Sequence, residues 1–334
     1  MDKSSRLDWL DVSKGIGALL VIMGHFTINN KLAALIYCFH MPLFFFLSGT
    51  IFKIDKYTTF KQFAIAKFKA LMIPYLIFNV FIWIFNAIRI LVCGEDAILI
   101  AKKFLGIFLG IKTTDYYGSV WFISCMFVTQ ILAYFIIKIT SGKKSMICVF
   151  GIASLALGWF YVSMVRIPLL WGSDTSLIAL FFLLLGYCLG TNNFLYSKKS
   201  IILFVPMLAG ALVNYRLCGY RVEMYANNYG VFWIFVLVAL CGIFATIALG
   251  KIAVNVKFLQ MLGKSSLYLY GAQLVFTDTF QRIANEYNLW WLSIKISVPI
   301  TIGLTVVCLV LLLLVKKYYE KLYTKCLAIC NRKA

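Results

Sequence analysis

Two histidines, His25 and His40, are the only imidazole groups among the 334 residues of this chain. Each lies inside an apolar stretch long enough to cross a bilayer. An ionisable side chain at membrane depth is costly to bury, so it usually faces a cavity and marks a functional position. Because imidazole takes up and releases a proton near neutral pH, the pair indicates acid–base chemistry within a membrane.

The residues around His25 predict a helix with one polar group near each end. Lys14 precedes His25 by eleven residues, which is close to three helical turns, so the two share a face about 16 Å apart along the axis. Asp11 lies one turn before Lys14 on nearly the same face. The next apolar stretch runs back across the membrane, which places His40 at a depth similar to that of His25. We expect both histidines in one cavity in the outer half of the bilayer.

Two simpler roles stay open for these groups. A histidine within a membrane often only bridges helices by hydrogen bonds, and the long side chain of Lys14 can extend to the cytoplasmic surface. A metal site is not expected, because two histidines without a set of carboxylates or thiolates beside them make a poor one.

The elements that position these groups follow from composition. The chain is 63% hydrophobic and 13% charged, whereas soluble domains average roughly 45–50% and about 25%. We therefore predict an all-α fold: a polytopic membrane helix bundle forming a single domain over residues 1–334, with no separate soluble domain. About ten transmembrane helices are predicted, at approximately 10–28, 32–52, 71–92, 119–139, 145–164, 173–190, 200–216, 230–250, 259–279 and 293–315.

The net charge of +20 is explained by membrane topology, and no nucleic-acid partner is expected. Most of the lysines and arginines fall in the tails and in the loops on the same side as the tails. Cytoplasmic loops carry such an excess, so both termini are predicted to be cytoplasmic. The alternation of charge favours an even number of spans; eight is the alternative to ten if two weak segments only dip into the bilayer. We expect a multi-pass protein of the cell (cytoplasmic or inner) membrane, with the lipid bilayer as its surroundings.

A second basic cluster, Lys61, Lys67 and Lys69, precedes Leu71-Met72-Ile73-Pro74-Tyr75, where the third predicted span begins. These lysines suit the phosphates of a nucleotide-bearing donor; equally, they are ordinary positive-inside charges. Farther along, the apolar fragment 104–110 is too short to span and is expected to form an interfacial or re-entrant helix.

Several of these stretches together resemble the acyltransferase-3 family of integral membrane O-acyltransferases, in particular its fucose 4-O-acetylase-like branch. The first two motifs are the most specific. The motifs are the run from Arg6 to Ile16 leading to Gly24-His25, the run from Phe39 to Gly49, Leu71-Met72-Ile73-Pro74-Tyr75, Trp121-Phe122, and the run from Leu262 to Tyr270.

The resemblance implies roles for individual residues. A basic residue followed after ten positions by a histidine is the catalytic signature of the family, which here corresponds to Lys14 and His25. Family members often have arginine at the first position. Lysine keeps the positive charge but lacks the two-pronged guanidinium group that binds a phosphate or carboxylate. Lys67 and Lys69, together with Lys14, are implied to hold the phosphates of coenzyme A.

The combined interpretation is a membrane O-acyltransferase that uses acyl-CoA, most simply acetyl-CoA, as co-substrate from the cytoplasm and needs no metal. Its acceptor is expected to be a hydroxyl of a carbohydrate at the outer side, either a surface polysaccharide or a lipid-linked sugar. His25 would act as general base, or as an acyl-carrying nucleophile, and His40 would orient the acceptor or polarise the carbonyl.

Three further residues, Asp11, Trp121 and Glu223, are weaker candidates for contacts with the substrate. Aromatic residues such as Trp121 also suit an interfacial belt that has no part in binding. The rival class of protein is a transporter or flippase of lipid-linked sugars or small anions, to which a bundle with buried polar groups is also suited.

Overall fold

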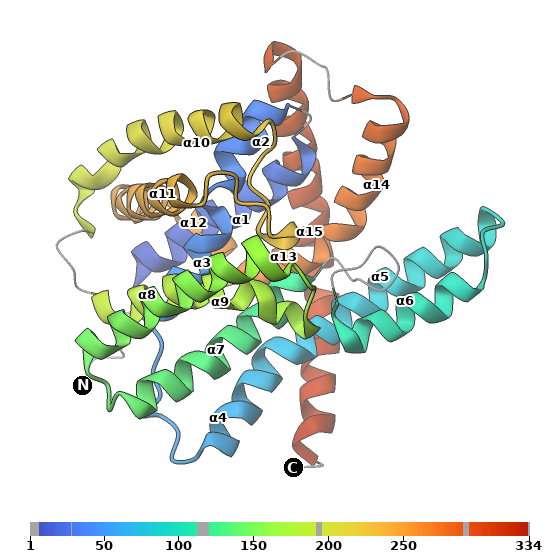
Figure 1. Cartoon of the computed structure of the whole chain (residues 1–334). Helices are drawn as coiled ribbons and strands as arrows, with labels where there is room; N and C mark the ends of the chain where they lie inside the picture. The colour runs from blue at the N-terminus through green and yellow to red at the C-terminus, as the bar shows by residue number, and fades with distance from the viewer. Residues whose placement is uncertain (1–6, 28, 112–119, 192–195, 290–293, 333–334) are drawn as a thin grey trace. The chain divides into compact units, whose positions relative to one another are not determined.

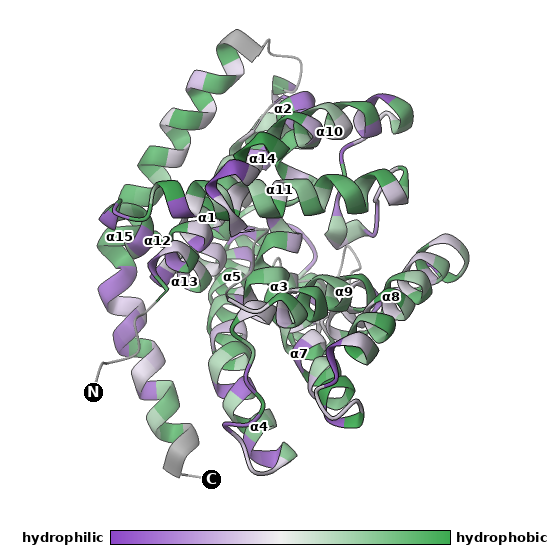
Figure 2. Cartoon of the chain, turned by 90° about the vertical axis from the view of Figure 1, so that its left-hand side faces the viewer, coloured by the Kyte–Doolittle hydropathy of each residue, from purple (hydrophilic) through white to green (hydrophobic). Residues whose placement is uncertain are grey.

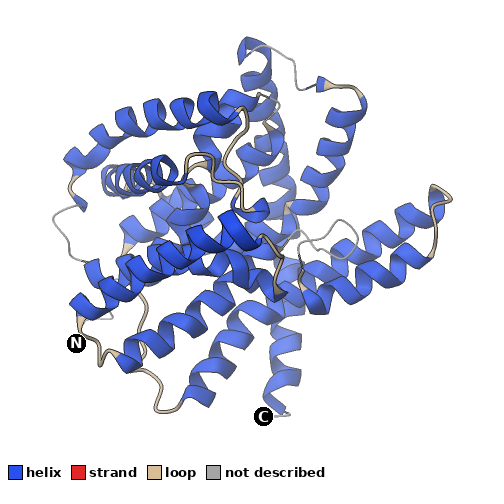
Figure 3. Ribbon diagram, in the orientation of Figure 1, coloured by secondary structure: helices blue, strands red, loops and turns tan. Residues whose placement is uncertain are grey.

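The computed structural model describes residues 7–27, 29–111, 120–191, 196–289 and 294–332. Across these residues the regular structure is helical, apart from an isolated bridge between Glu223 and Asn228 (Figure 3). Nine helical runs in this part of the chain are long and apolar enough to cross a membrane. The predicted fold class, a polytopic all-α membrane protein, is confirmed.

The nine runs follow the apolar stretches of the sequence, and polar or turn-forming residues separate them. They are Asp8–Phe26 (α1), Asn30–Thr50 (α2, Asn30–Tyr37, and α3, His40–Thr50), Phe60–Val92 (α4, Phe60–Lys67, and α5, Ile73–Val92), Trp121–Ile139 (α7), Lys144–Val165 (with α8, Lys144–Phe160), Leu170–Leu189 (with α9, Ser173–Leu189), Lys198–Cys218 (with α10, Phe204–Cys218), Phe232–Ile252 (α11) and Ile296–Ile329 (within α15, Ile294–Arg332).

The predicted span over 259–279 differs from the other spans. It is divided among three consecutive short helices, α12 (Lys257–Lys264), α13 (Ser266–Ala272) and α14 (Leu274–Glu286), which are separated at Ser265 and Gln273. Polar side chains at both breaks weaken a continuous apolar helix there. No single one of the three is long enough to cross a bilayer. The even number of crossings, and with it the cytoplasmic placement of both termini, stays a prediction.

The helices group into two compact units. The first comprises Met1–Ser48, Leu189–Met224 and Asn228–Val310, and the second comprises Gly49–Cys188, Tyr225–Asn227 and Leu311–Ala334. Each unit contains several of the membrane-spanning runs. The single membrane domain expected from the sequence stays a prediction.

In the first unit, α1 is the central element (Figure 1), with α2, α11, α12, α13 and α14 all in contact with it. The contact between α1 and α12 depends on two glycines. A Cβ atom on Gly15 would overlap the carbonyl of Leu259, and one on Gly263 would overlap the carbonyl of Asp11. Without these side chains the two helix backbones lie against each other. The neighbouring helix α11 is hydrophobic along its length (Figure 2), as a bilayer requires.

In the second unit, α5 pairs with α6 (Ile98–Leu109) as an antiparallel hairpin (Figure 1). The Tyr75 hydroxyl donates to the carbonyl of Ile107 at 2.7 Å, and Trp83 Nε1 donates to the carbonyl of Ile100 at 2.9 Å. The fragment 104–110, expected as an interfacial or re-entrant helix, thus belongs to a short helix that packs along α5.

Candidate active site

Helix α1 carries Lys14 in its second turn and His25 in its last turn, and it is continuous between them, as the spacing predicted. His25 lies in the last turn, and its Nδ1 is 2.8 Å from the carbonyl oxygen of Val21. Thr27, just beyond the helix, donates in the same way to the carbonyl of Met23 at 2.7 Å. These bonds hold the two side chains against the end of α1.

The bond to Val21 decides where the proton of His25 resides. A backbone carbonyl can only accept, so Nδ1 carries the hydrogen, and in the neutral ring Nε2 is left with a lone pair. The same holds for His40, whose Nδ1 is 2.9 Å from the carbonyl oxygen of Ile36. Among the described residues nothing hydrogen-bonds either Nε2 atom. Both imidazoles are therefore oriented as proton acceptors.

Tyr37 lies between the two histidines. Its ring centroid is 4.9 Å from that of His40, in an edge-on arrangement, and 6.3 Å from that of His25. His40 is only 2% exposed, whereas His25 is partly exposed. The structure thus brings together the two histidines that the sequence placed at similar depth, and the more accessible one is His25.

Arg221, in the segment between α10 and α11, lies over the ring of Tyr37. Its guanidinium carbon is 4.3 Å from the centroid of Tyr37, a cation–π contact, and its Nη2 is 3.6 Å from Glu223 Oε1. We call His25, Tyr37, His40, Arg221 and Glu223 the histidine cluster. Neither Tyr37 nor Arg221 was predicted from the sequence as a residue of the site. Tyr37 was detectable as the residue one helical turn before His40, but no local signal connects Arg221 with position 37.

Asp11 and Lys14 lie at the other end of α1. Asp11 is 6% exposed and packs against Gly263 of α12, and Lys14 is partly exposed. Eleven residues of helix separate Lys14 from His25, about 16 Å at the usual rise. The ammonium group of Lys14 therefore lies far from the histidines. This arrangement suits a long substrate that lies along α1.

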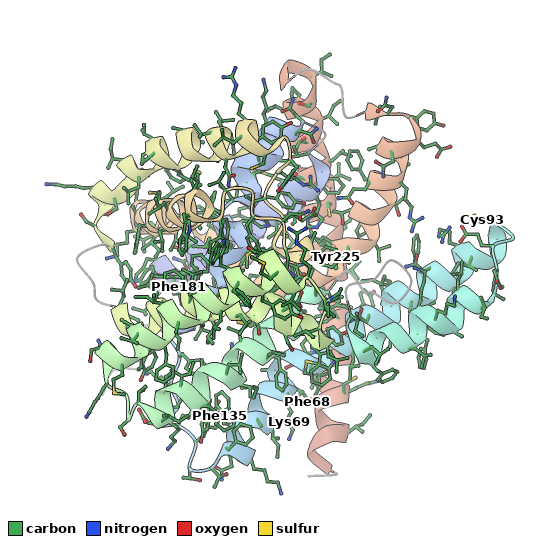
Figure 4. All side chains as sticks on the ribbon, in the orientation of Figure 1. Phe68, Lys69, Cys93, Phe135, Phe181 and Tyr225 are labelled. Atoms are coloured by element: carbon green, nitrogen blue, oxygen red, sulfur yellow. The ribbon has the colours of Figure 1, made fainter. Side chains whose placement is uncertain are left out.

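Lys67 and Lys69 belong to the second unit. Lys67 is the last residue of α4, and Lys69 lies in the π-helical turn, Phe68–Met72, that joins α4 to α5 (Figure 4). Such turns are frequent at functional sites. Lys67 Nζ is 5.0 Å from the ring centroid of Phe52 and 5.4 Å from that of Phe63. No carboxylate among the described residues lies within ion-pair distance of this partly exposed ammonium group, so it is well suited to bind an anion.

Trp121 and Glu223, the weaker candidates, lie in different units. Trp121 begins α7 and is 8% exposed, and its ring centroid is 6.2 Å from that of Tyr225. Glu223 exchanges backbone hydrogen bonds with Asn228, at 2.6 and 3.0 Å, and is part of the histidine cluster. The roles of both in binding stay predictions.

A bundle of membrane-spanning helices that holds two imidazoles close together defines the class: a polytopic helical membrane protein. A family model described as an acyltransferase domain matches residues 7–313. The chain therefore belongs to the acyltransferase-3 family and is a membrane acyltransferase. The comparison with curated proteins found no match, and neither did the comparison with solved structures. The fucose 4-O-acetylase-like branch stays a prediction.

Proposed function

We propose that this acyltransferase transfers an acyl group, most simply acetyl, from acyl-CoA to a hydroxyl of a surface polysaccharide or lipid-linked sugar. The observation that carries the proposal is the tautomer of His25, whose Nδ1 is engaged by Val21 while Nε2 stays free to accept a proton. A base at the accessible end of α1 is what a hydroxyl acceptor requires.

In the proposed reaction, His25 Nε2 takes the proton of the sugar hydroxyl as its oxygen attacks the thioester carbonyl. A carbon–oxygen bond forms, the carbon–sulfur bond breaks, and the imidazolium returns the proton to the departing coenzyme A thiolate. His40, held by Tyr37, orients the acceptor or polarises the carbonyl. The variant with a transient acyl group on His25 predicts ping-pong kinetics.

The remaining candidates take supporting roles in this proposal. Lys14, Lys67 and Lys69 hold phosphates of the donor, and Asp11 contributes a substrate contact beside Lys14. Glu223 accepts hydrogen bonds from sugar hydroxyls, and Trp121 offers an apolar face to a sugar ring.

Replacing Lys67 with alanine is expected to raise KM for acetyl-CoA roughly 10- to 100-fold, because a hydrogen bond to a charged group contributes about 1.5–3 kcal/mol. The value of kcat should change little. The measurement is steady-state kinetics on purified protein. Lys143→Ala is the matched control, since Lys143 is an exposed lysine of the same unit that lies outside this basic cluster, and Lys67→Arg should retain most of the affinity. An unchanged KM in Lys67→Ala would remove Lys67 from the donor site.

The function itself is tested by mass spectrometry of digested surface glycans from cells that carry or lack this chain. We expect an added O-acyl mass only with the chain, together with release of free coenzyme A from acetyl-CoA in isolated membranes. The transporter alternative is not favoured, since the family consists of acyltransferases. Altered passage of lipid-linked sugars with neither acyl mass nor coenzyme A release would revive it.

A further inference from the structure

Gln273 is a fully buried side chain that has no hydrogen bond. It lies at the junction of α13 and α14 and is 0% exposed. Its backbone is satisfied: the N–H donates to Leu269 at 3.3 Å and the carbonyl accepts from the N–H of Thr277 at 3.0 Å. The side-chain Oε1 and Nε2, however, have no partner among the described residues.

An amide in this state is costly. Leaving a buried donor or acceptor unpaired costs about 1–3 kcal/mol for each group, and a membrane interior offers no bulk water to replace the partner. Other buried amides are bonded at one end at least. Asn79 Nδ2 donates to the carbonyl of Tyr75 at 2.9 Å, and both ends of Asn214 are bonded. Within the described residues, Gln273 is the buried amide with both ends unpaired. Such a group calls for a ligand.

The neighbours of Gln273 locate it along α1. Ten residues before it, Gly263 packs against Asp11 at the Lys14 end. Eight residues after it, Gln281 Nε2 donates to the carbonyl of His25 at 3.4 Å. Gln273 is the N-cap of α14 and residues 274–281 are helical, so Gln273 lies about 12 Å from the His25 contact. Both α13 and α14 contact α1. The unpaired amide of Gln273 therefore lies beside the stretch of α1 between Lys14 and His25.

We infer that the Gln273 amide binds the pantetheine arm of the acyl donor. The inference rests on the proposed function, in which the donor is acyl-CoA. Pantetheine carries two secondary amides, each with one N–H and one carbonyl, and a glutamine amide offers the complementary acceptor and donor. With its nucleotide at the Lys14 end and its thioester near His25, the arm passes Gln273 on the way.

The test replaces Gln273 with methionine, which has a similar volume and no hydrogen-bonding amide. Binding is measured on purified protein in lipid nanodiscs with acetyl-CoA and with adenosine 3′,5′-bisphosphate, which has the donor's phosphates but no pantetheine. We expect acetyl-CoA to bind about tenfold more weakly, and the bisphosphate to bind as it does to the wild type. The thermal midpoint should be unchanged or higher, because an unpaired polar group has been removed.

Asn214→Leu is the matched control. Asn214 is a buried amide of the same unit, but it donates to the Tyr229 carbonyl at 3.1 Å and accepts from the Val231 N–H at 2.8 Å. Its replacement should lower the thermal midpoint and leave acetyl-CoA binding unchanged.

Three results would overturn the inference. Gln273→Met binding acetyl-CoA as tightly as the wild type, with a lower thermal midpoint, would identify a structural amide bonded to water. Equal weakening of both probes would indicate a general disturbance of the donor site. A wild-type protein that binds neither acetyl-CoA nor the bisphosphate would refute the proposed donor itself, and the inference with it.

Discussion

We expect the replacement of His25 with alanine to abolish measurable acyl transfer while the protein stays folded in the membrane. A positioned general base contributes typically 10²–10⁴-fold to a rate, so kcat should fall by about that factor. The fold should tolerate the change, because the ring is partly exposed and its hydrogen bond is to a carbonyl within its own helix. The measurement is the O-acyl mass on surface glycans at matched amounts of membrane protein, supported by coenzyme A release.

Thr27→Val is the matched control for His25→Ala. Thr27 lies at the same end of α1 and makes the same kind of bond to the carbonyl four residues earlier. The variant therefore loses the structural contact without losing a base, and its acyl transfer should remain close to that of the wild type. Comparable losses in the two variants would mean that the end of α1, and not the imidazole, is what activity requires.

The variant His40→Gln distinguishes the role of His40 from that of His25. Because His40 is buried and packs edge-on against Tyr37, its replacement should weaken acceptor binding or stability more than it lowers kcat. Full acylation in His25→Ala together with complete loss in His40→Gln would exchange their roles.

The comparison with the sequence shows which parts of the site are locally encoded. The separation of Lys14 from His25 depends on helix geometry alone, so it was predictable from residue spacing and is confirmed. The approach of His40 to His25 was predictable because the chain reverses direction between them. The contact of Arg221 with Tyr37 was not, because it joins residues far apart in the chain and depends on how α2 and α10 pack.

The broken segment shows a second limit. Hydropathy predicted one helix over 259–279, whereas the structure has three, with breaks at Ser265 and Gln273. Hydropathy averaged over a window changes little when one residue is polar. A single polar residue can nevertheless end a helix. The break at Gln273 is also where the unpaired amide lies. Gln273 therefore both interrupts the helix that hydropathy predicted and supplies the amide that we propose to bind the donor.

Adding one methyl group at Gly263 is expected to be strongly destabilising. A Cβ there would overlap the carbonyl of Asp11, a backbone atom that cannot rotate away as a side chain can. Gly263→Ala must therefore push α12 away from α1. Such overpacking costs about 1–3 kcal/mol, occasionally more. We expect a thermal midpoint several degrees lower in detergent or nanodiscs, and a loss of activity as well, because α12 and the following segment with Gln273 move relative to Lys14 and His25 on α1.

Gly303→Ala is the matched control for Gly263→Ala. Gly303 lies within α15, and a Cβ there meets nothing within 4 Å. Alanine in a helix interior is better than glycine by roughly 0.5–1 kcal/mol, so this variant should be neutral or slightly stabilising. Opposite signs for the same substitution would show that the contact of α1 with α12, and not helix propensity, sets the effect at Gly263. Equal midpoints for Gly263→Ala and Gly303→Ala would mean that the two helices do not pack closely at Asp11. The segment that carries Gln273 would then not be fixed against α1 at its Gly263 end, and the placement of Gln273 beside α1 would lose that support.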